Sequence, residues 1–284
     1  MFNKLLIYLK NFDWILFTAV LLLICFGLAE IYSVALGRSE LDLLNFKKQI
    51  FFIILGIILL FFLAFFDYLS LRSYSKYFYV LGLILLIGVL FFGQTIRGTK
   101  GWYSLAGFNL QPVEFIKFVL ILFLAKYFSS ASPKTKEFKR LLISGSGALL
   151  FIILVLAQPD FGSAFVLFLS WLSMIILIGF NKKYLLAIGL ILAIVFSGAW
   201  YFALEDYQKQ RIITFLNPSF NPLSQGYNVS QAIIAVGAGR LAGRGLGFGS
   251  QSQLKFLPEA QTDFIFAVAL DIFNNNFCRR GFVD

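Results

Sequence analysis

The segment Trp14–Leu36, WILFTAVLLLICFGLAEIYSVAL, decides the fold class of this 284-residue chain. It is apolar almost throughout and long enough to cross a hydrocarbon layer of about 30 Å as a helix. The segment is too long for the apolar core of a cleaved secretory signal, and further apolar segments follow it. We therefore predict that it is a retained first transmembrane helix.

The rest of the chain repeats this pattern. Hydrophobic residues make up 60% of the sequence and charged residues 13%, and the mean hydropathy of +0.84 lies outside the range of soluble domains. We predict an all-α polytopic membrane protein with about eight transmembrane helices, forming a single domain over residues 1–284. The expected spans are Trp14–Leu36, Ile50–Phe66, Tyr77–Phe92, Pro112–Phe128, Leu141–Ala157, Phe161–Phe180, Tyr184–Ala203 and a last one starting at Asp263.

The basic residues indicate the orientation of the spans. The formal net charge is +10, but Lys and Arg lie in short connections rather than on one face, so nucleic acid is not an expected partner. Placing the N-terminus in the cytoplasm puts most of these residues on the inner side, as the positive-inside rule requires. Residues 204–262 then form a large extracytoplasmic loop between the seventh and eighth helices, too long for a simple connection.

The chain lacks the usual parts of several kinds of site. It contains no histidine, and its two cysteines are Cys25 and Cys278. Zinc sites, a disulfide framework and Cys/His nucleophilic pairs are therefore not expected. Any chemistry must use carboxylates, lysine, arginine or tyrosine.

A carboxylate pair stands beside the last apolar segment. In Leu257–Phe266, LPEAQTDFIF, Asp263 lies where a polar loop gives way to the span and Glu259 precedes it by four residues. Asp263 could simply be a helix N-cap, stabilised by the helix dipole. On the outer face it could instead take a proton from an incoming hydroxyl group.

A glycine series, Gly237–Gly249, precedes this carboxylate pair and follows a segment, Tyr227–Val236, that is expected to be helical. It contains Arg240 and Arg244. Glycines let a backbone approach another segment or a ligand closely. The series is either a flexible or tightly packed loop, or a place where backbone N–H groups and arginines face phosphate.

Three further positions carry polar or aromatic groups at the ends of spans. Glu114 and Lys117 share one helix face, either as a structural ion pair or as part of a polar site. Asp160 either caps the helix that follows it or contributes to a polar cavity. Trp102 is typical of an interfacial anchor, with sugar stacking as the alternative.

Taken together and in order, the motifs of this chain resemble those of the SEDS family of bacterial membrane proteins, the RodA/FtsW/SpoVE group. The matching segments are Gly98–Trp102, Gln111–Glu114 with Lys117, Gln158–Gly162, Asn217-Pro218, Gly226-Tyr227, Gln231, Gly237–Gly249 and Leu257–Phe266. The stretch Gln251–Glu259 is more similar to the RodA elongation branch than to the FtsW division branch.

The resemblance implies a peptidoglycan glycosyltransferase of the bacterial cytoplasmic membrane, with about ten spans in the family. Its substrate would be lipid II, the undecaprenyl-pyrophosphate-linked disaccharide-pentapeptide, and its partner a class B penicillin-binding protein. The essential aspartate of the family falls on Asp263, as general base. Lys117, Arg240, Arg244 or a divalent cation would stabilise the departing pyrophosphate, and no cofactor is otherwise implied.

The chain also departs from the family pattern. Gln261 stands where the family usually has histidine, and residues 270–284 replace a Glu-Glu pair and two further spans, which predicts a truncated or altered C-terminal end. Two other functions stay open for such a chain. One is a flippase or transporter for lipid II or another lipid carrier, and the other is a non-catalytic scaffold for a penicillin-binding protein.

Overall fold

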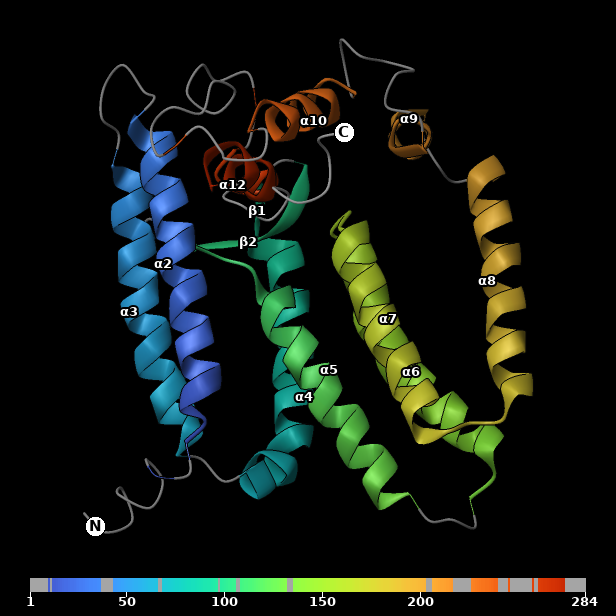
Figure 1. Ribbon diagram of the computed structural model, residues 1–284. Helices are drawn as coiled ribbons and strands as arrows, with labels where there is room; N and C mark the ends of the chain where they lie inside the picture. Colours follow the sequence, from blue (N-terminus) through green and yellow to red (C-terminus); the bar gives the residue numbers. More distant parts are fainter. Residues whose placement is uncertain are drawn as a thin grey trace, which may run out of the picture. The chain divides into compact units, whose positions relative to one another are not determined.

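The structure, a computed structural model, is mostly helical (Figure 1). The residues that it describes are 10, 12–36, 43–65, 68–96, 98–105, 108–131, 135–202, 206–216, 226–239, 245, 257 and 260–273. The chain divides into two compact units. One unit contains Met1–Phe65 and Ser197–Asp284, and the other contains Phe66–Phe196.

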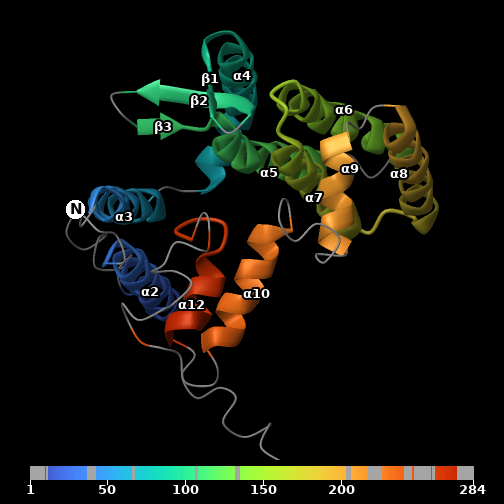
Figure 2. The same cartoon turned by 90° about the horizontal axis from the view of Figure 1, so that it is seen from above.

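The first unit begins with two apolar helices, α2 (Trp14–Leu36) and α3 (Leu44–Ala64), which lie side by side (Figures 1 and 2). The Asp13 carboxylate accepts a hydrogen bond of 2.9 Å from the Leu16 amide and so satisfies a free donor at the start of α2. The Phe17 ring of α2 lies 5.4 Å from the Phe61 ring of α3. Both helices expose most of their apolar side chains, as expected where the surrounding medium is lipid.

Three shorter helices complete the described part of this unit: α9 (Asp206–Leu216), α10 (Tyr227–Gly239) and α12 (Ile265–Phe273). Helices α10 and α12 pack against each other, as Figure 2 shows. A side chain at Gly239 would collide with the Leu270 carbonyl oxygen, so glycine is required for this close approach. The apolar core of the unit consists of Val34, Ala235, Leu257, Ala260, Ala267, Val268 and Ile272.

The second unit contains the helices α4 (Tyr68–Phe92), α5 (Pro112–Ser130), α6 (Glu137–Leu156), α7 (Phe161–Ile178) and most of α8 (Lys182–Phe202). Helix α5 packs against α4, α6 and α7. Its side chains Ile116, Leu120 and Leu124 are fully buried among residues of these neighbours. Some polar groups in this unit are paired within it: for example, the Tyr79 hydroxyl donates to the Gly147 carbonyl oxygen over 2.7 Å.

A small antiparallel sheet joins α4 to α5, so the prediction of an all-α fold is wrong at this point. The strands are β1 (Gln94–Ile96), β2 (Thr99–Leu105) and β3 (Phe108–Leu110), in that order. Ile96 pairs with Thr99, and Gly98 in the connecting turn has a positive φ of 85°. Glycine adopts a positive φ without a steric penalty, as a tight reversal between two strands often requires.

Five of the described helices are long and apolar enough to cross a membrane: α2, α3, α4 from Leu69, α6 and α7. They coincide with five of the expected spans, which are thereby confirmed as long apolar helices. The α5 segment, expected to be a span, carries Glu114, Lys117 and Lys126. At nine residues, α12 is too short to cross a layer of about 30 Å by itself. The total number of spans and the cytoplasmic position of the N-terminus stay predictions, as does the single domain over 1–284.

Candidate active site

Asp263 lies in an exposed turn directly before α12. The turn runs from Ala260 to Phe264, and the Thr262 carbonyl oxygen accepts a bond of 3.5 Å from the Ile265 amide where the helix begins. Ala260 is buried and Phe264 packs against the apolar core of the first unit, whereas Asp263 faces outward. Both ends of the turn are therefore anchored by apolar packing while its carboxylate stays accessible.

The Asp263 carboxylate makes no hydrogen bond with any other residue that the structure describes. An N-cap would accept a bond from a backbone N–H two or three residues further along the chain. The capping alternative therefore finds no support among these residues. An accessible carboxylate without a fixed partner can accept a proton from a substrate group.

A second polar group lies in the other unit, around Asp160. Its Oδ1 accepts a bond of 3.0 Å from the Ser163 amide and its Oδ2 one of 2.7 Å from the Ser163 hydroxyl. The Gln111 side-chain amide donates to Oδ2 over 3.2 Å. The prediction that Asp160 caps the next helix is confirmed, because α7 starts at Phe161.

The sequence did not single out Gln111 and Gln158 as parts of this polar group. Gln158 is 2% exposed. Its side-chain oxygen lies close to Gly101, only 3.2 Å from where a Cβ atom would be if that residue had one. Its side-chain nitrogen is buried without a partner among the described residues. Both glutamines stand immediately before a proline beside an apolar run, Gln111 before the run and Gln158 after it, and this is the signal that could have identified them.

Glu114 and Lys117 form an ion pair in the first turns of α5, with Nζ and Oε1 2.7 Å apart. Pro112 occupies the first helical position, where its missing N–H costs no hydrogen bond. The two side chains share one face, as their spacing predicts. The pair keeps two charges at the end of the helix close to neutral.

Trp102 is half-buried in β2, next to the buried Gly101. Its neighbour Tyr103 donates a hydrogen bond of 3.0 Å to the Leu85 carbonyl oxygen of α4 and lies over Gly88. Burial raises the pKa of the Tyr103 hydroxyl, so this group stays protonated and remains a donor. A hydrogen bond from this tyrosine therefore fixes the sheet to α4.

Arg240, Arg244 and Glu259 lie outside the described residues. Of the glycine series beyond α10, Gly245 is described: its φ is 93° and its amide donates to the Ile272 carbonyl oxygen over 3.1 Å. This contact places one glycine against the end of α12. In the described part of the chain, no three His, Cys, Asp or Glu side chains gather into a metal-binding group, and the divalent cation stays a prediction.

Two carboxylates in the first unit were not predicted as site residues from the sequence. Glu30 in α2 is 3% exposed and Asp271 in α12 is fully buried. The signal for Glu30 is a single acidic residue inside a long apolar segment, which is costly in a membrane.

The described candidate site residues fall into two groups. Asp263 belongs to the first unit, and Trp102, Glu114, Lys117 and Asp160 belong to the second.

The sequence model of the FtsW, RodA and SpoVE cell cycle proteins matches residues 13–273 of this chain. Stage V sporulation protein E of Bacillus subtilis is 35% identical over 265 residues, which cover 90% of this chain and 71% of that protein. Peptidoglycan glycosyltransferase MrdB of Escherichia coli is 33% identical over 237 residues, which cover 82% of this chain and 62% of that protein.

Two solved structures have a fold similar to that of this chain. A chain of a peptidoglycan synthase complex, described as coordinating polymerization and crosslinking, superposes with a TM-score of 0.73 at 25% identity, covering 92% of this chain and 71% of that one. The rod shape determining protein RodA of Thermus thermophilus superposes with a TM-score of 0.56 at 21% identity, covering 92% and 94%. This multi-pass membrane protein belongs to the FtsW/RodA/SpoVE (SEDS) family.

Proposed function

We propose that this chain is a peptidoglycan glycosyltransferase that polymerises lipid II at the outer face of the bacterial cytoplasmic membrane, during elongation and maintenance of cell shape. The observation that carries the proposal is the position of Asp263, an accessible carboxylate directly before α12, inside the region matched by the family model. Relatives matched by this chain are named peptidoglycan glycosyltransferases.

Asp263 acts as the general base. It takes the proton from the 4-hydroxyl of the acceptor GlcNAc as that oxygen attacks C1 of the donor MurNAc. The new glycosidic bond forms while the bond from C1 to the pyrophosphate breaks, and undecaprenyl pyrophosphate leaves with the electron pair. The sugar gains oxocarbenium character in the transition state, as in other glycosyl transfers.

The leaving pyrophosphate accumulates negative charge and needs cationic stabilisation. Lys117, Arg240, Arg244 and a divalent cation are the candidates. Lys117 is paired with Glu114 over 2.7 Å, so much of its charge is already compensated. This pairing favours the two arginines of the glycine series.

The proposed partner is a class B penicillin-binding protein, which would cross-link the glycan strands that this chain makes. The similar chain of the peptidoglycan synthase complex supports a partner of this kind. The exposed apolar surface of the long helices supports a location in the lipid of the cytoplasmic membrane.

The test is polymerisation of purified lipid II by the purified full chain together with such a partner. Wild-type protein should produce glycan strands, and Asp263→Asn should produce none. Asp206→Asn serves as the matched control, because Asp206 is another exposed carboxylate at the start of a helix in the same unit. Strand synthesis by Asp263→Asn at the wild-type rate would exclude Asp263 as the base.

A further inference from the structure

A hydrogen bond connects two distant parts of the chain beside Asp263. The side-chain amide of Asn45 donates to the side-chain oxygen of Gln261 over 2.7 Å, across 216 positions of sequence. Asn45 is the second residue of α3, and Gln261 lies in the turn that holds Asp263. Both residues belong to the first unit, so the contact lies within one compact part of the molecule.

The Asn45–Gln261 hydrogen bond reaches the turn between its two packed ends. Ala260 and Phe264 are anchored in the core of the unit at the two ends of the turn. Between them, Thr262 and Asp263 are exposed, and Gln261 is half-buried. The Asn45–Gln261 bond fixes a point two residues before Asp263, between the two ends that apolar packing holds.

We propose that Asn45 is a positioning residue that, through Gln261, orients the Asp263 carboxylate toward the acceptor hydroxyl. This inference rests on the proposed function, since it assigns a role within the same reaction. Asn45 does not touch the reacting atoms. Its effect comes from geometry, because a general base works only within hydrogen-bond reach of the proton that it removes.

Kinetics with lipid II give the first test. Displacing a reacting group by about 1 Å can cost roughly a hundredfold in rate. For Asn45→Ala and for Gln261→Ala we expect about a tenfold lower kcat, with KM for lipid II changed by less than about twofold. The double variant should be no slower than either single variant, because both changes remove the same bond.

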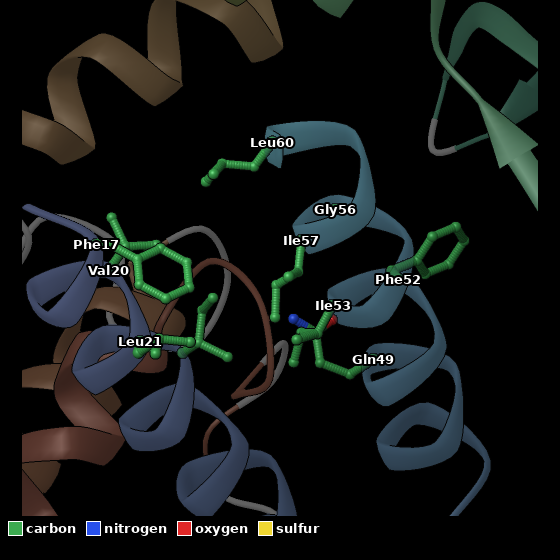
Figure 3. Close-up of a pocket in the computed structure, with 10 residues that line it drawn as sticks. Phe17, Val20, Leu21, Gln49, Phe52, Ile53, Gly56, Ile57 and Leu60 are labelled. Carbon is green, nitrogen blue, oxygen red and sulfur yellow. The ribbon is translucent and has the colours of Figure 1, made fainter. Parts of the chain in front are cut away.

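Two further variants separate positioning from general damage. Exchanging the two amides, Asn45→Gln together with Gln261→Asn, moves one methylene group across the contact and should restore kcat to within about twofold of wild type. Gln49→Ala is the matched control, because Gln49 carries the same amide one turn further along α3 but lines an apolar hollow of about 270 Å³ between α2 and α3 (Figure 3). It should leave kcat unchanged.

A readout without lipid II tests the contact itself. With Cys25 and Cys278 replaced by serine, the pair Asn45→Cys and Gln261→Cys should be cross-linked rapidly by a short bifunctional maleimide in membranes, because the two hydrogen-bonded amide side chains are longer than a disulfide bridge. The pair Gln49→Cys and Gln261→Cys should be cross-linked more slowly.

The two tests distinguish failure of the proposed function from failure of the positioning role. If the cross-link forms while wild-type protein makes no glycan, the proposed function fails, and with it the role in the reaction, although the contact stands. If wild-type protein polymerises lipid II, the positioning role is overturned by any of three results: cross-linking no faster than for the Gln49 pair, single alanine variants at the wild-type kcat, or an exchanged pair no faster than the single variants.

Discussion

The turn around Asp263 and the polar group around Asp160 place a carboxylate at the start of a helix in two different ways. Asp160 accepts three hydrogen bonds, from Gln111 and from two groups of Ser163. Asp263 accepts none from the described residues and faces outward. A carboxylate whose lone pairs are occupied holds a structure together, whereas one with free lone pairs can exchange a proton. The difference separates an aspartate that caps a helix from the aspartate that we propose as the base.

The largest expected effect belongs to Asp263. Asp263→Asn keeps the shape of the side chain and removes the base, so polymerisation of lipid II should fall by about 100- to 10,000-fold. Because the carboxylate is exposed and has no described partner, the unfolding temperature in detergent should not change measurably. A large drop in unfolding temperature would give Asp263 a structural role and end the contrast with Asp160.

The opposite pattern is expected for Asp160. Asp160→Ala removes the N-cap of α7 and the partner of Gln111, so the protein should lose about 2 kcal/mol of stability. Asp160→Asn keeps one acceptor oxygen for the Ser163 amide and should lose less. Thermal unfolding of both variants checks the order. Loss of lipid II polymerisation by Asp160→Asn at an unchanged unfolding temperature would place Asp160 in the reaction.

A smaller effect should come from the contact between the sheet and α4. A Cβ at Gly88 would lie 2.6 Å from the Tyr103 hydroxyl oxygen, so Gly88→Ala should cost about 1–2 kcal/mol through overpacking. Tyr103→Phe alone should cost about 1 kcal/mol, because it removes the bond to Leu85.

The two changes should also be coupled, because Phe lacks the atom that clashes. The double variant Gly88→Ala with Tyr103→Phe should be more stable than the sum of the single effects predicts, as a double-mutant cycle of unfolding temperatures would measure. Simple additivity would contradict the close approach of Tyr103 to α4.

The smallest effect is expected for the Glu114–Lys117 pair, since Glu114 is mostly exposed. Removing either partner leaves one uncompensated charge at the end of α5, whereas replacing both with leucine leaves none. The double variant should therefore give more monodisperse protein in size-exclusion chromatography than either single variant. A well-folded double variant that fails to polymerise lipid II would instead make the pair part of a polar site.

The long helices could be predicted from the sequence because the membrane requires a run of apolar residues. Helix α2 has the expected bounds, and α7 starts at the expected Phe161. Helix α4 begins at Tyr68 rather than Tyr77, because its first turns are polar and an apolar pattern does not reveal them. The three strands were not predicted from the sequence for a related reason. Two of them have only three residues, which are too few to establish an alternating pattern.

The site was predictable only in part. Asp263 and the capping role of Asp160 could be inferred from their place before an apolar run, which is a local signal. The Gln111–Asp160 bond spans 49 positions and the Asn45–Gln261 bond 216 positions. Such contacts depend on how helices pack, and neither partner carries a local signal of the other.

The contact between Gly245 and the end of α12 anchors that helix at the end opposite to Asp263. Asp263 lies two residues before its first residue, and the Ile272 carbonyl oxygen near its last residue accepts a bond from the Gly245 amide. Nine helical residues form a stiff rod about 14 Å long. An anchor at one end of such a rod limits how far its other end, beside Asp263, can tilt.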